Sequence, residues 1–459
     1  MIKIPLVATL REHAGRIGRN GMIVGALGFL SVALQRFGFT RADGSSFQLV
    51  TLVLVATVAW VLIRVRMAVG YRGVILFSLL VLTVAVSTIV SGIRGGLVTS
   101  NMSLAFLVVT YTVMLTSGGW RENGNPGRRF FAGAVFAIRL GAVTAIVQFV
   151  VQSAGGGYLD PLKGISSTWL RTGFNNYYQI SGTDHYKPNG VIFLEPSFLS
   201  LYAALALVDV VGRTFRANRA SAVVQGSIWT GILAAGLAVS ASTSGLVVLA
   251  VAAVPLALTI RKNRYVLSTL AVLAVGTVVA LWAGVFTSVI AKATEGFSIG
   301  TSSGLRLQLP YQLLAPYWLE RPIFGWGPGA ASSAVKQIAV PGLQESTVMK
   351  LLVEYGLLGA VVIALCVWVA VRRSGAPAYL IAAILAAWLI PTESLLNSTL
   401  VLMVLFVVPN WCTNLDPPRG PRWYDGYAPA IAKWGSKPAS ASRAVPLRDA
   451  GRGELRVRR

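Results

Sequence analysis

The chain has 459 residues, of which 55% are hydrophobic and 12% are charged, and its mean hydropathy is +0.67. A soluble domain of this size carries about 25% charged residues, so the composition excludes an ordinary soluble enzyme. Lysine and arginine outnumber aspartate and glutamate 40 to 16, for a net charge of +24. In a soluble protein this excess would suggest nucleic acid, but beside so much apolar sequence it indicates a lipid surface instead.

Apolar runs of about 20 residues, each long enough to cross a bilayer, recur along the whole chain. No strand-like alternation competes with them. We therefore predict an all-α polytopic membrane protein, with a transmembrane domain over residues 21–412. The twelve expected spans are 21–35, 47–63, 73–92, 97–116, 130–152, 191–211, 222–240, 244–260, 265–290, 346–371, 377–392 and 396–412.

Basic residues are concentrated in alternate connections between these spans. RVRMAVGYR, RTFRANR and RKNR all fall on the same side as the N-terminus, and the positive-inside rule makes that side cytoplasmic. Residues 1–20 are then a basic cytoplasmic N-terminus without a cleavable signal. Residues 413–459 are a basic, Pro- and Ser-rich cytoplasmic tail that we expect to be disordered and attracted to anionic lipid.

Two connections on the opposite face are much longer than the others. They cover residues 153–190 and 291–345, and we refer to them as loop one and loop two. Long loops are uncommon and are usually functional. We therefore expect the functional surface to face the outside, which is the periplasm if the membrane is a bacterial inner membrane.

Loop one ends in the sequence DHYKPNGVIFLEPS (residues 184–197), which brings Lys187, Asn189 and Glu195 to the mouth of a span. Ionisable groups so close to hydrocarbon usually face a polar cavity, so we predict a binding role for these three. The alternative is an interfacial loop with a snorkelling Lys187 and a solvated Glu195. His185 is a candidate acid or base, or else an ordinary surface histidine.

Loop two contains an amphipathic stretch, residues 305–320, which predicts a helix lying along the membrane interface. Arg306 stands near its start and can either grip a phosphate group with both arms of its guanidinium or anchor to lipid headgroups. The sequence GWGPG at residues 325–329 predicts a tight turn.

The span that follows loop two opens with charged residues. Lys350 and Glu354 have i, i+4 spacing, so we expect them to form an ion pair on one helix face. Glu345 has no partner at helical spacing. It stands at the helix N-terminus, where the helix dipole favours a carboxylate and where a capping role would suffice to explain it.

Arg139 lies in the middle of the span 130–152. A mid-membrane arginine should face the protein interior, where it either pairs with an acid such as Glu393 or binds a substrate anion. The sequence has no phosphate-binding nucleotide loop and no His, Cys or carboxylate cluster at metal-ligand spacing, so we expect neither a cofactor nor a metal.

Three segments, in this order and spacing, resemble the bacterial O-antigen ligase and polysaccharide polymerase (Wzy-like) superfamily. Together they cover residues 186–359. The resemblance implies a GT-C-like membrane fold that acts on undecaprenyl-pyrophosphate-linked glycans without a metal or a nucleotide sugar. The segments are YKPNGVIFLEPSFLSLYAA, SSGLRLQLPYQLLAPYWLERPIFGWGPG and ESTVMKLLVEYGLLG.

The resemblance also implies roles for individual residues. Lys187 stands where the family usually has an arginine, and Arg306 matches the arginine of its second loop; both would hold the pyrophosphate, with Arg139 as a third candidate. Glu345 stands where ligases typically have a histidine, which favours a polymerase or a relative with a carboxylate base.

The predicted function is an inverting, metal-independent glycosyltransferase. It would polymerise lipid-linked repeat units of O-antigen, capsule or exopolysaccharide at the outer face of the bacterial inner membrane, with both termini cytoplasmic. A flippase and a chain-length regulator are expected partners. An O-antigen ligase or O-oligosaccharyltransferase is the alternative in the same superfamily. A lipid-linked oligosaccharide flippase is the alternative from another class, although transporters usually carry internal repeats and the halves of this chain show none.

Overall fold

The computed structural model divides the chain into a unit spanning Met1–Leu415 and a C-terminal unit spanning Asp416–Arg459. All described residues belong to the first unit, so the predicted tail lies outside them, as does nearly all of the predicted N-terminal segment. The described residues are 19–40, 46–64, 71–93, 95, 100, 103–104, 107, 125–166, 168–171, 179, 184–217, 220–260, 308–340, 343, 345–389 and 398–411.

Helices form at ten of the twelve predicted spans. The remaining two predictions, 97–116 and 265–290, fall wholly or mostly outside the described residues. The ten are covered by α2 (Arg19–Ala33), α3 (Leu49–Arg64), α4 (Tyr71–Ile93), α6 (Pro126–Ser153), α7 (Pro196–Thr214), α8 (Ala220–Val239), α9 (Thr243–Ile260), α14 (Thr347–Arg373), α15 (Ala378–Leu389) and α16 (Ser398–Leu402), which continues as the π-helix η3 (Met403–Val407).

Five of the described helices are long and apolar enough to cross a membrane: α4, α6, α7, α8 and α14. α2, α3, α9 and α15 contain shorter apolar stretches. The predicted multi-pass helical membrane protein is therefore confirmed in this general form, while the number of twelve spans and the GT-C-like arrangement stay predictions.

Several short elements lie in the connections. β1 (Gly38–Thr40) and β2 (Ser46–Gln48) form an antiparallel hairpin, a small departure from the all-helical expectation. Loop one contains the 3₁₀-helix η1 (Pro161–Gly164), and loop two contains α12 (Leu309–Glu320) and α13 (Ala330–Ile338). α12 confirms a helix within the predicted stretch 305–320, although Arg306 itself lies outside the described residues.

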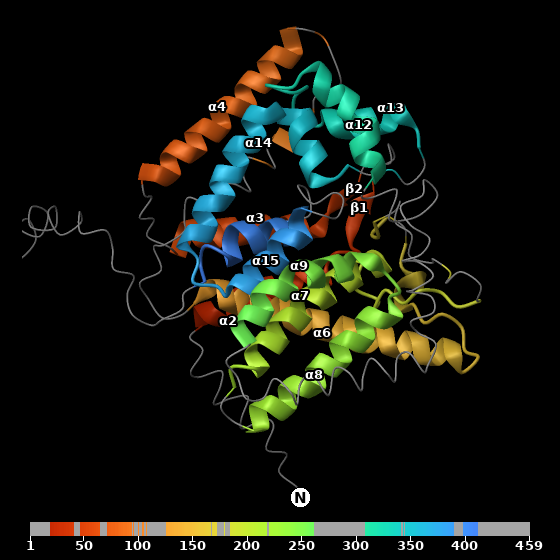
Figure 1. Cartoon of the computed structure of the whole chain (residues 1–459). Helices are drawn as coiled ribbons and strands as arrows, with labels where there is room; N and C mark the ends of the chain where they lie inside the picture. The colour runs from red at the N-terminus through yellow and green to blue at the C-terminus, as the bar shows by residue number, and fades with distance from the viewer. Residues whose placement is uncertain are drawn as a thin grey trace, which may run out of the picture. The chain divides into compact units, whose positions relative to one another are not determined.

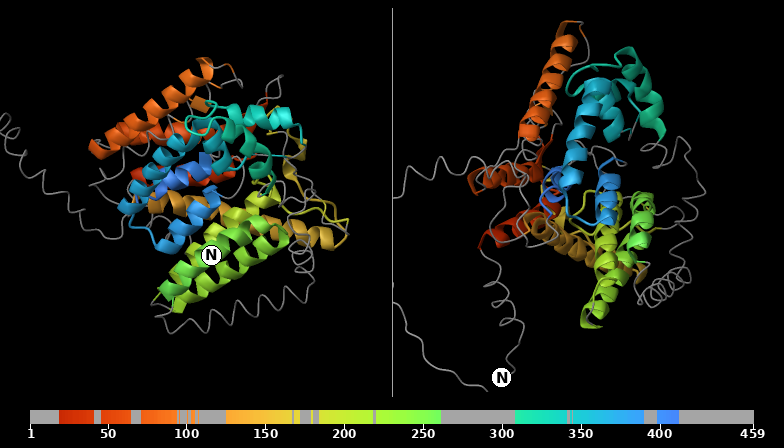
Figure 2. Two further views of the ribbon diagram at one scale, coloured as in Figure 1. Left: turned by 45° about the horizontal axis from the view of Figure 1, so that its top comes forward. Right: turned by 60° about the vertical axis from the view of Figure 1, so that its left-hand side comes forward.

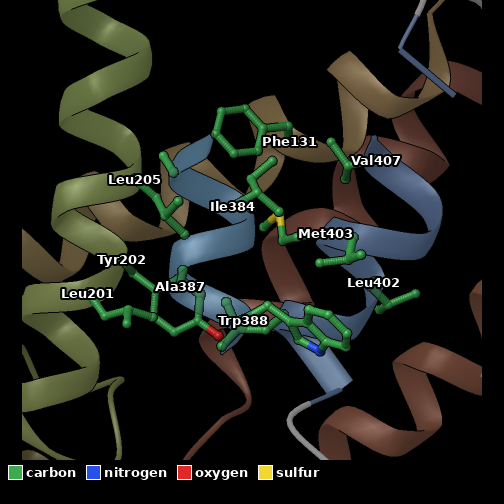
Figure 3. Packing of buried hydrophobic residues seen from close by; sticks show 14 of the residues in the cluster. Phe131, Leu201, Tyr202, Leu205, Ile384, Ala387, Trp388, Leu402, Met403 and Val407 are labelled. Carbon is green, nitrogen blue, oxygen red and sulfur yellow. The ribbon is translucent and has the colours of Figure 1, made fainter. Parts of the chain in front are cut away.

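α7 is the most deeply buried of the five long helices and packs against α6, α8, α9 and α15. Its small residues Ala203, Ala204 and Ala206 let neighbouring helices approach closely, as small residues do in membrane bundles. The interface with α15 is shown in Figure 3, in which Leu201, Tyr202 and Leu205 of α7 lie beside α15, which carries Ile384 and Ala387.

A second group consists of α4, α12, α13 and α14, which pack together (Figures 1 and 2). α14 also contacts α15 and η3. The Thr347 hydroxyl at its start donates to the backbone carbonyl of Trp388 near the end of α15, at 2.7 Å. The small apolar core of the second group consists of Leu314, Ala330, Ala331, Ala334, Met349 and Val353.

Candidate functional site

Two buried glutamines on α6 hold the end of loop one in place. The side chain of Gln152 forms two hydrogen bonds with the backbone of Tyr186, accepting from its N–H at 2.8 Å and donating to its carbonyl at 3.1 Å. One turn earlier, Gln148 accepts from the N–H of Gly190 at 2.9 Å. Since i, i+4 residues share a helix face, α6 fixes both ends of the 186–190 segment.

This segment carries Lys187 and Asn189 into the protein. Lys187 is only 4% exposed, and its ammonium lies 3.5 Å from the backbone carbonyl of Ala241, between α8 and α9. Asn189 is fully buried, and its side-chain amide nitrogen has no hydrogen-bond partner among the described atoms. His185, just before them, is half-buried. A buried Lys187 does not match the alternative of a snorkelling lysine in an interfacial loop.

Glu195 occupies the N-cap position of α7, directly before Pro196. Its carboxylate accepts a hydrogen bond from the Ser197 hydroxyl at 3.0 Å, and the residue is 7% exposed. A proline is favoured at the first helical position because its missing N–H is not needed there. The motif therefore starts the most buried of the five long described helices with a buried carboxylate, rather than with a solvated one.

The charged residues at the start of α14 form a buried cluster. The Lys350 ammonium lies 2.8 Å from the Glu354 carboxylate, which confirms the predicted pair. It also lies 3.0 Å from Glu345 at i+5, a partner that helical spacing does not predict. Ser332 of α13 completes the cluster: its hydroxyl donates to Glu345 at 2.6 Å and accepts from Lys350 at 3.2 Å. We call these four residues the Lys350 cluster.

Glu345 is held in the ionised form by this cluster. Burial alone would raise its pKa, but the positive charge of Lys350 and the hydrogen bond from Ser332 outweigh burial and lower the pKa to about 2. The helix cap is Ser346, whose hydroxyl accepts from the N–H of Met349 at 3.2 Å. The capping explanation for Glu345 is therefore wrong, and its side chain is directed to Lys350 and Ser332 instead.

α14 is broken at Gly356, which has φ of +63° and ψ of −168°. The segment 322–327 of loop two, which we call the inserted turn, lies against this break. Four backbone hydrogen bonds join the two: Leu357 N–H to Pro322 O (2.8 Å), Leu358 N–H to Ile323 O (3.2 Å), Trp326 N–H to Val353 O (2.8 Å) and Gly327 N–H to Glu354 O (2.9 Å).

These bonds replace the two helical hydrogen bonds that the break opens, because Leu357 would otherwise pair with Val353 and Leu358 with Glu354. All four backbone groups keep a partner, as non-helical backbone in a membrane protein requires. The positive φ values of Gly325 and Gly327 confirm the predicted tight turn. The GWGPG motif of loop two and the glycine break of α14 are thus joined by backbone hydrogen bonds into one structural unit.

Two serines of α4 stabilise the same junction. The Ser87 hydroxyl donates to the backbone carbonyl of Glu354 at 2.8 Å, and the Ser91 hydroxyl donates to that of Trp326. Ser87 and Ser91 have i, i+4 spacing within an apolar span, a signal that sequence reasoning missed. Sequence reasoning also missed Ser332. Its one signal in the sequence is its place between the GWGPG motif and the charged opening of α14.

Arg139 is brought neither to the end of loop one nor to the Lys350 cluster by the described contacts. The Arg139 guanidinium stacks on the ring of Trp229 of α8, 4.5 Å from its centroid. Its Nε atom is buried without a hydrogen-bond partner among the described atoms. The acid considered as its partner, Glu393, lies outside the described residues, as does Arg306, so their roles stay predictions. Within the described part of the chain, no three His, Cys, Asp or Glu side chains are grouped to hold a metal ion.

Comparison with protein families gives one match. A family model described as O-antigen ligase matches residues 228–364, less than a third of the chain. The matched segment runs from α8 into α14. It includes α12, α13, the inserted turn and all four residues of the Lys350 cluster. The resemblance found in the sequence is thereby confirmed. Searches of curated proteins and of solved structures gave no match.

Proposed function

We propose that this chain, as a member of the O-antigen ligase superfamily, is an inverting, metal-independent glycosyltransferase. It would join undecaprenyl-pyrophosphate-linked repeat units into a polysaccharide at the outer face of the bacterial inner membrane. The single observation that carries this proposal is Glu345, an ionised, buried carboxylate within the family-matched segment. The sequence resemblance implies that ligases of the superfamily typically have a histidine at this position.

The donor substrate already has a good leaving group, the lipid pyrophosphate. The protein has to stabilise the negative charge that develops as the glycosidic bond breaks. Lys187 is suited to this role because its ammonium is buried at the start of the loop-one motif. Arg306 is the second candidate, since a guanidinium can bind phosphate oxygens with two parallel hydrogen bonds.

The acceptor sugar has to lose a proton as its hydroxyl oxygen attacks the anomeric carbon of the donor. With a pKa of about 2, Glu345 is always ionised near neutral pH, but it is a weak base. We therefore propose that it first orients the acceptor hydroxyl by accepting its hydrogen bond. It takes the proton late, after the attack has made the hydroxyl strongly acidic. Ser332 and Lys350 hold the carboxylate in place throughout.

Separate Glu345→Gln and Arg306→Ala substitutions test this mechanism. We expect each to reduce polymerisation by about 100-fold or more, because each removes either the proton acceptor or a cation on the leaving group. The measurement is the chain length of glycan from cells that carry each variant as their only copy, resolved by gel electrophoresis. Glu320→Gln, at the exposed end of α12, is the matched control and should leave chain length unchanged.

The products also separate a polymerase from a ligase. Single repeat units that accumulate on the lipid support the polymerase, whereas full-length polymer that stays unattached identifies a ligase. Long polymer of normal amount and attachment in both variants would refute the proposed mechanism.

The low pKa of Glu345 predicts how stability depends on pH. The ordinary pKa of 4.5 falls to about 2 in the folded protein, so this carboxylate stabilises the fold fully above about pH 5 and loses that contribution as the pH falls towards 2. The melting temperatures of the wild type and Glu345→Gln in detergent should therefore differ by a constant amount from pH 5 to pH 8. Below pH 4.5 this difference should become smaller. A difference that widens on acidification would contradict the prediction.

A further inference from the structure

A second buried ion pair lies outside the residues considered so far. Arg36 follows α2, and Asp160 lies in loop one directly before η1. The Arg36 guanidinium forms two parallel hydrogen bonds with the Asp160 carboxylate, at 3.0 and 2.8 Å. Their side chains are 3% and 0% exposed. A pair buried so completely is costly to desolvate, so its position needs a reason beyond charge neutralisation.

The same guanidinium holds a strained turn. Arg36 donates a third hydrogen bond, of 2.8 Å, to the backbone carbonyl of Val191. Val191 has a φ of +66°, and the N–H of Ile192 donates to the carbonyl of Gly190 at 2.7 Å across it. This is the γ-turn of positive φ, the rarer and more strained kind. A β-branched residue rarely adopts positive φ, and such strain persists only where surrounding contacts enforce it.

The other side of the turn is held by α6. The Thr144 hydroxyl donates to the Gly190 carbonyl at 2.8 Å, and Gln148 accepts from the Gly190 N–H. The backbone here lies so close to α6 that a Cβ on Gly190 would stand 2.3 Å from the carbonyl oxygen of Gly141. The Val191 turn is therefore held from one side by Arg36 and from the other side by α6, an arrangement that we call the clamp.

We propose that Arg36 and Asp160 are positioning residues for the loop-one substrate site. Val191 stands midway between Lys187 and Glu195, so its turn sets where each of them lies. Asp160 orients the guanidinium, the guanidinium holds the turn, and the turn places Lys187 for the donor pyrophosphate. This inference rests on the proposed function, in which Lys187 binds that group.

The test is Arg36→Lys in the full-length protein. Lysine keeps the charge but cannot bind Asp160 with two parallel bonds and reach Val191 as well. We expect the KM for the lipid-linked donor to rise about tenfold, because a misplaced Lys187 binds the donor pyrophosphate less tightly. We expect kcat to fall as well, because the same ammonium stabilises the charge that develops on the leaving group. Reaction rates are measured in membrane vesicles with lipid-linked repeat units extracted from cells. Arg128→Lys, an exposed arginine at the start of α6, is the matched control.

Val191→Gly supplies an independent readout. Glycine adopts positive φ without strain, so a glycine at position 191 depends less on the Arg36 guanidinium to keep the turn in place. In the Arg36→Lys background, Val191→Gly should therefore restore most of the lost donor affinity. An unchanged KM in Arg36→Lys overturns the proposal. So does a loss in kcat alone, or a KM defect that Val191→Gly does not relieve.

A binding measurement keeps this inference separate from the proposed function. Undecaprenyl pyrophosphate is titrated into the detergent-purified wild type and into Arg36→Lys. If neither polymer nor ligation product is formed by the wild type, the proposed function fails; about tenfold weaker binding to Arg36→Lys would then still support the clamp, and equal binding would overturn it.

Discussion

Gly356→Ala should unfold the junction between α14 and loop two. A Cβ at this position would stand 2.2 Å from the carbonyl oxygen of Ile323 and 2.6 Å from the backbone nitrogen of Phe324. Neither backbone atom can rotate away as a flexible side chain would. The dihedral angles of Gly356, +63° and −168°, also belong to a region that is essentially restricted to glycine. Alanine would be accommodated only if the inserted turn left the break.

We expect this substitution to destabilise the protein by more than about 3 kcal/mol, from backbone strain together with the four lost hydrogen bonds. The first measurement is the melting temperature of the detergent-purified protein. The second is whether the protein elutes from a sizing column as a single monodisperse species. Gly231→Ala on α8 is the control, because an added Cβ there meets nothing within 4 Å. A melting temperature for Gly356→Ala within about 2 °C of the control would contradict the account.

The second large effect is expected at Lys350. Lys350→Met removes the one cation of a cluster in which Glu345 and Glu354 both face it, within 3.0 Å and 2.8 Å. Lysine and methionine have similar length and volume, so the packing changes little. Two buried carboxylates are left without their counter-charge, which costs about 3–5 kcal/mol when one partner of a buried pair is removed.

A triple variant separates this electrostatic cost from packing. Lys350→Met combined with Glu345→Gln and Glu354→Gln removes all three charges, and replacement of a whole buried ion cluster is often close to neutral. We expect the triple variant to regain most of the lost thermal stability and yet to show polymerisation reduced by about 100-fold or more, because Glu345 is absent. Lys336→Met, on the exposed side of α13, is the single-site control. A triple variant no more stable than Lys350→Met would show that the lysine acts through packing.

The features that sequence reasoning predicted are those with a local signal. A membrane span needs a long apolar run, and the Lys350–Glu354 pair needs only helical spacing, so both were recognised. Glu345 was misjudged because it precedes the cap residue Ser346, whose backbone is extended. Helical spacing does not apply across that point, and the contact with Lys350 at i+5 is a product of the extended backbone.

The features that escaped prediction join parts of the chain that no short pattern connects. Arg36 and Asp160 are 124 positions apart, and each looks like an ordinary loop residue in its own surroundings. The break at Gly356 is similar: in an apolar run, a lone glycine indicates close helix packing. Only the fold reveals that a segment of loop two fills the opened backbone.

The burial of α7 has a consequence for how the protein is made. It is the least apolar of the five long helices, and it contains Asp209, which is 1% exposed and pairs with Arg213. Asp209 lies in the last third of α7, where an aspartate opposes insertion by less than the value of about 3 kcal/mol that applies at the centre of a span. Together with its low hydropathy, this makes α7 the least suited of the five long helices to partition into lipid on its own. One of its partners, α15, begins at Ala378 and leaves the ribosome long after α7. We therefore expect α7 to be retained during synthesis, by the translocation machinery or by α6 and α8, until the last part of the chain arrives to enclose it.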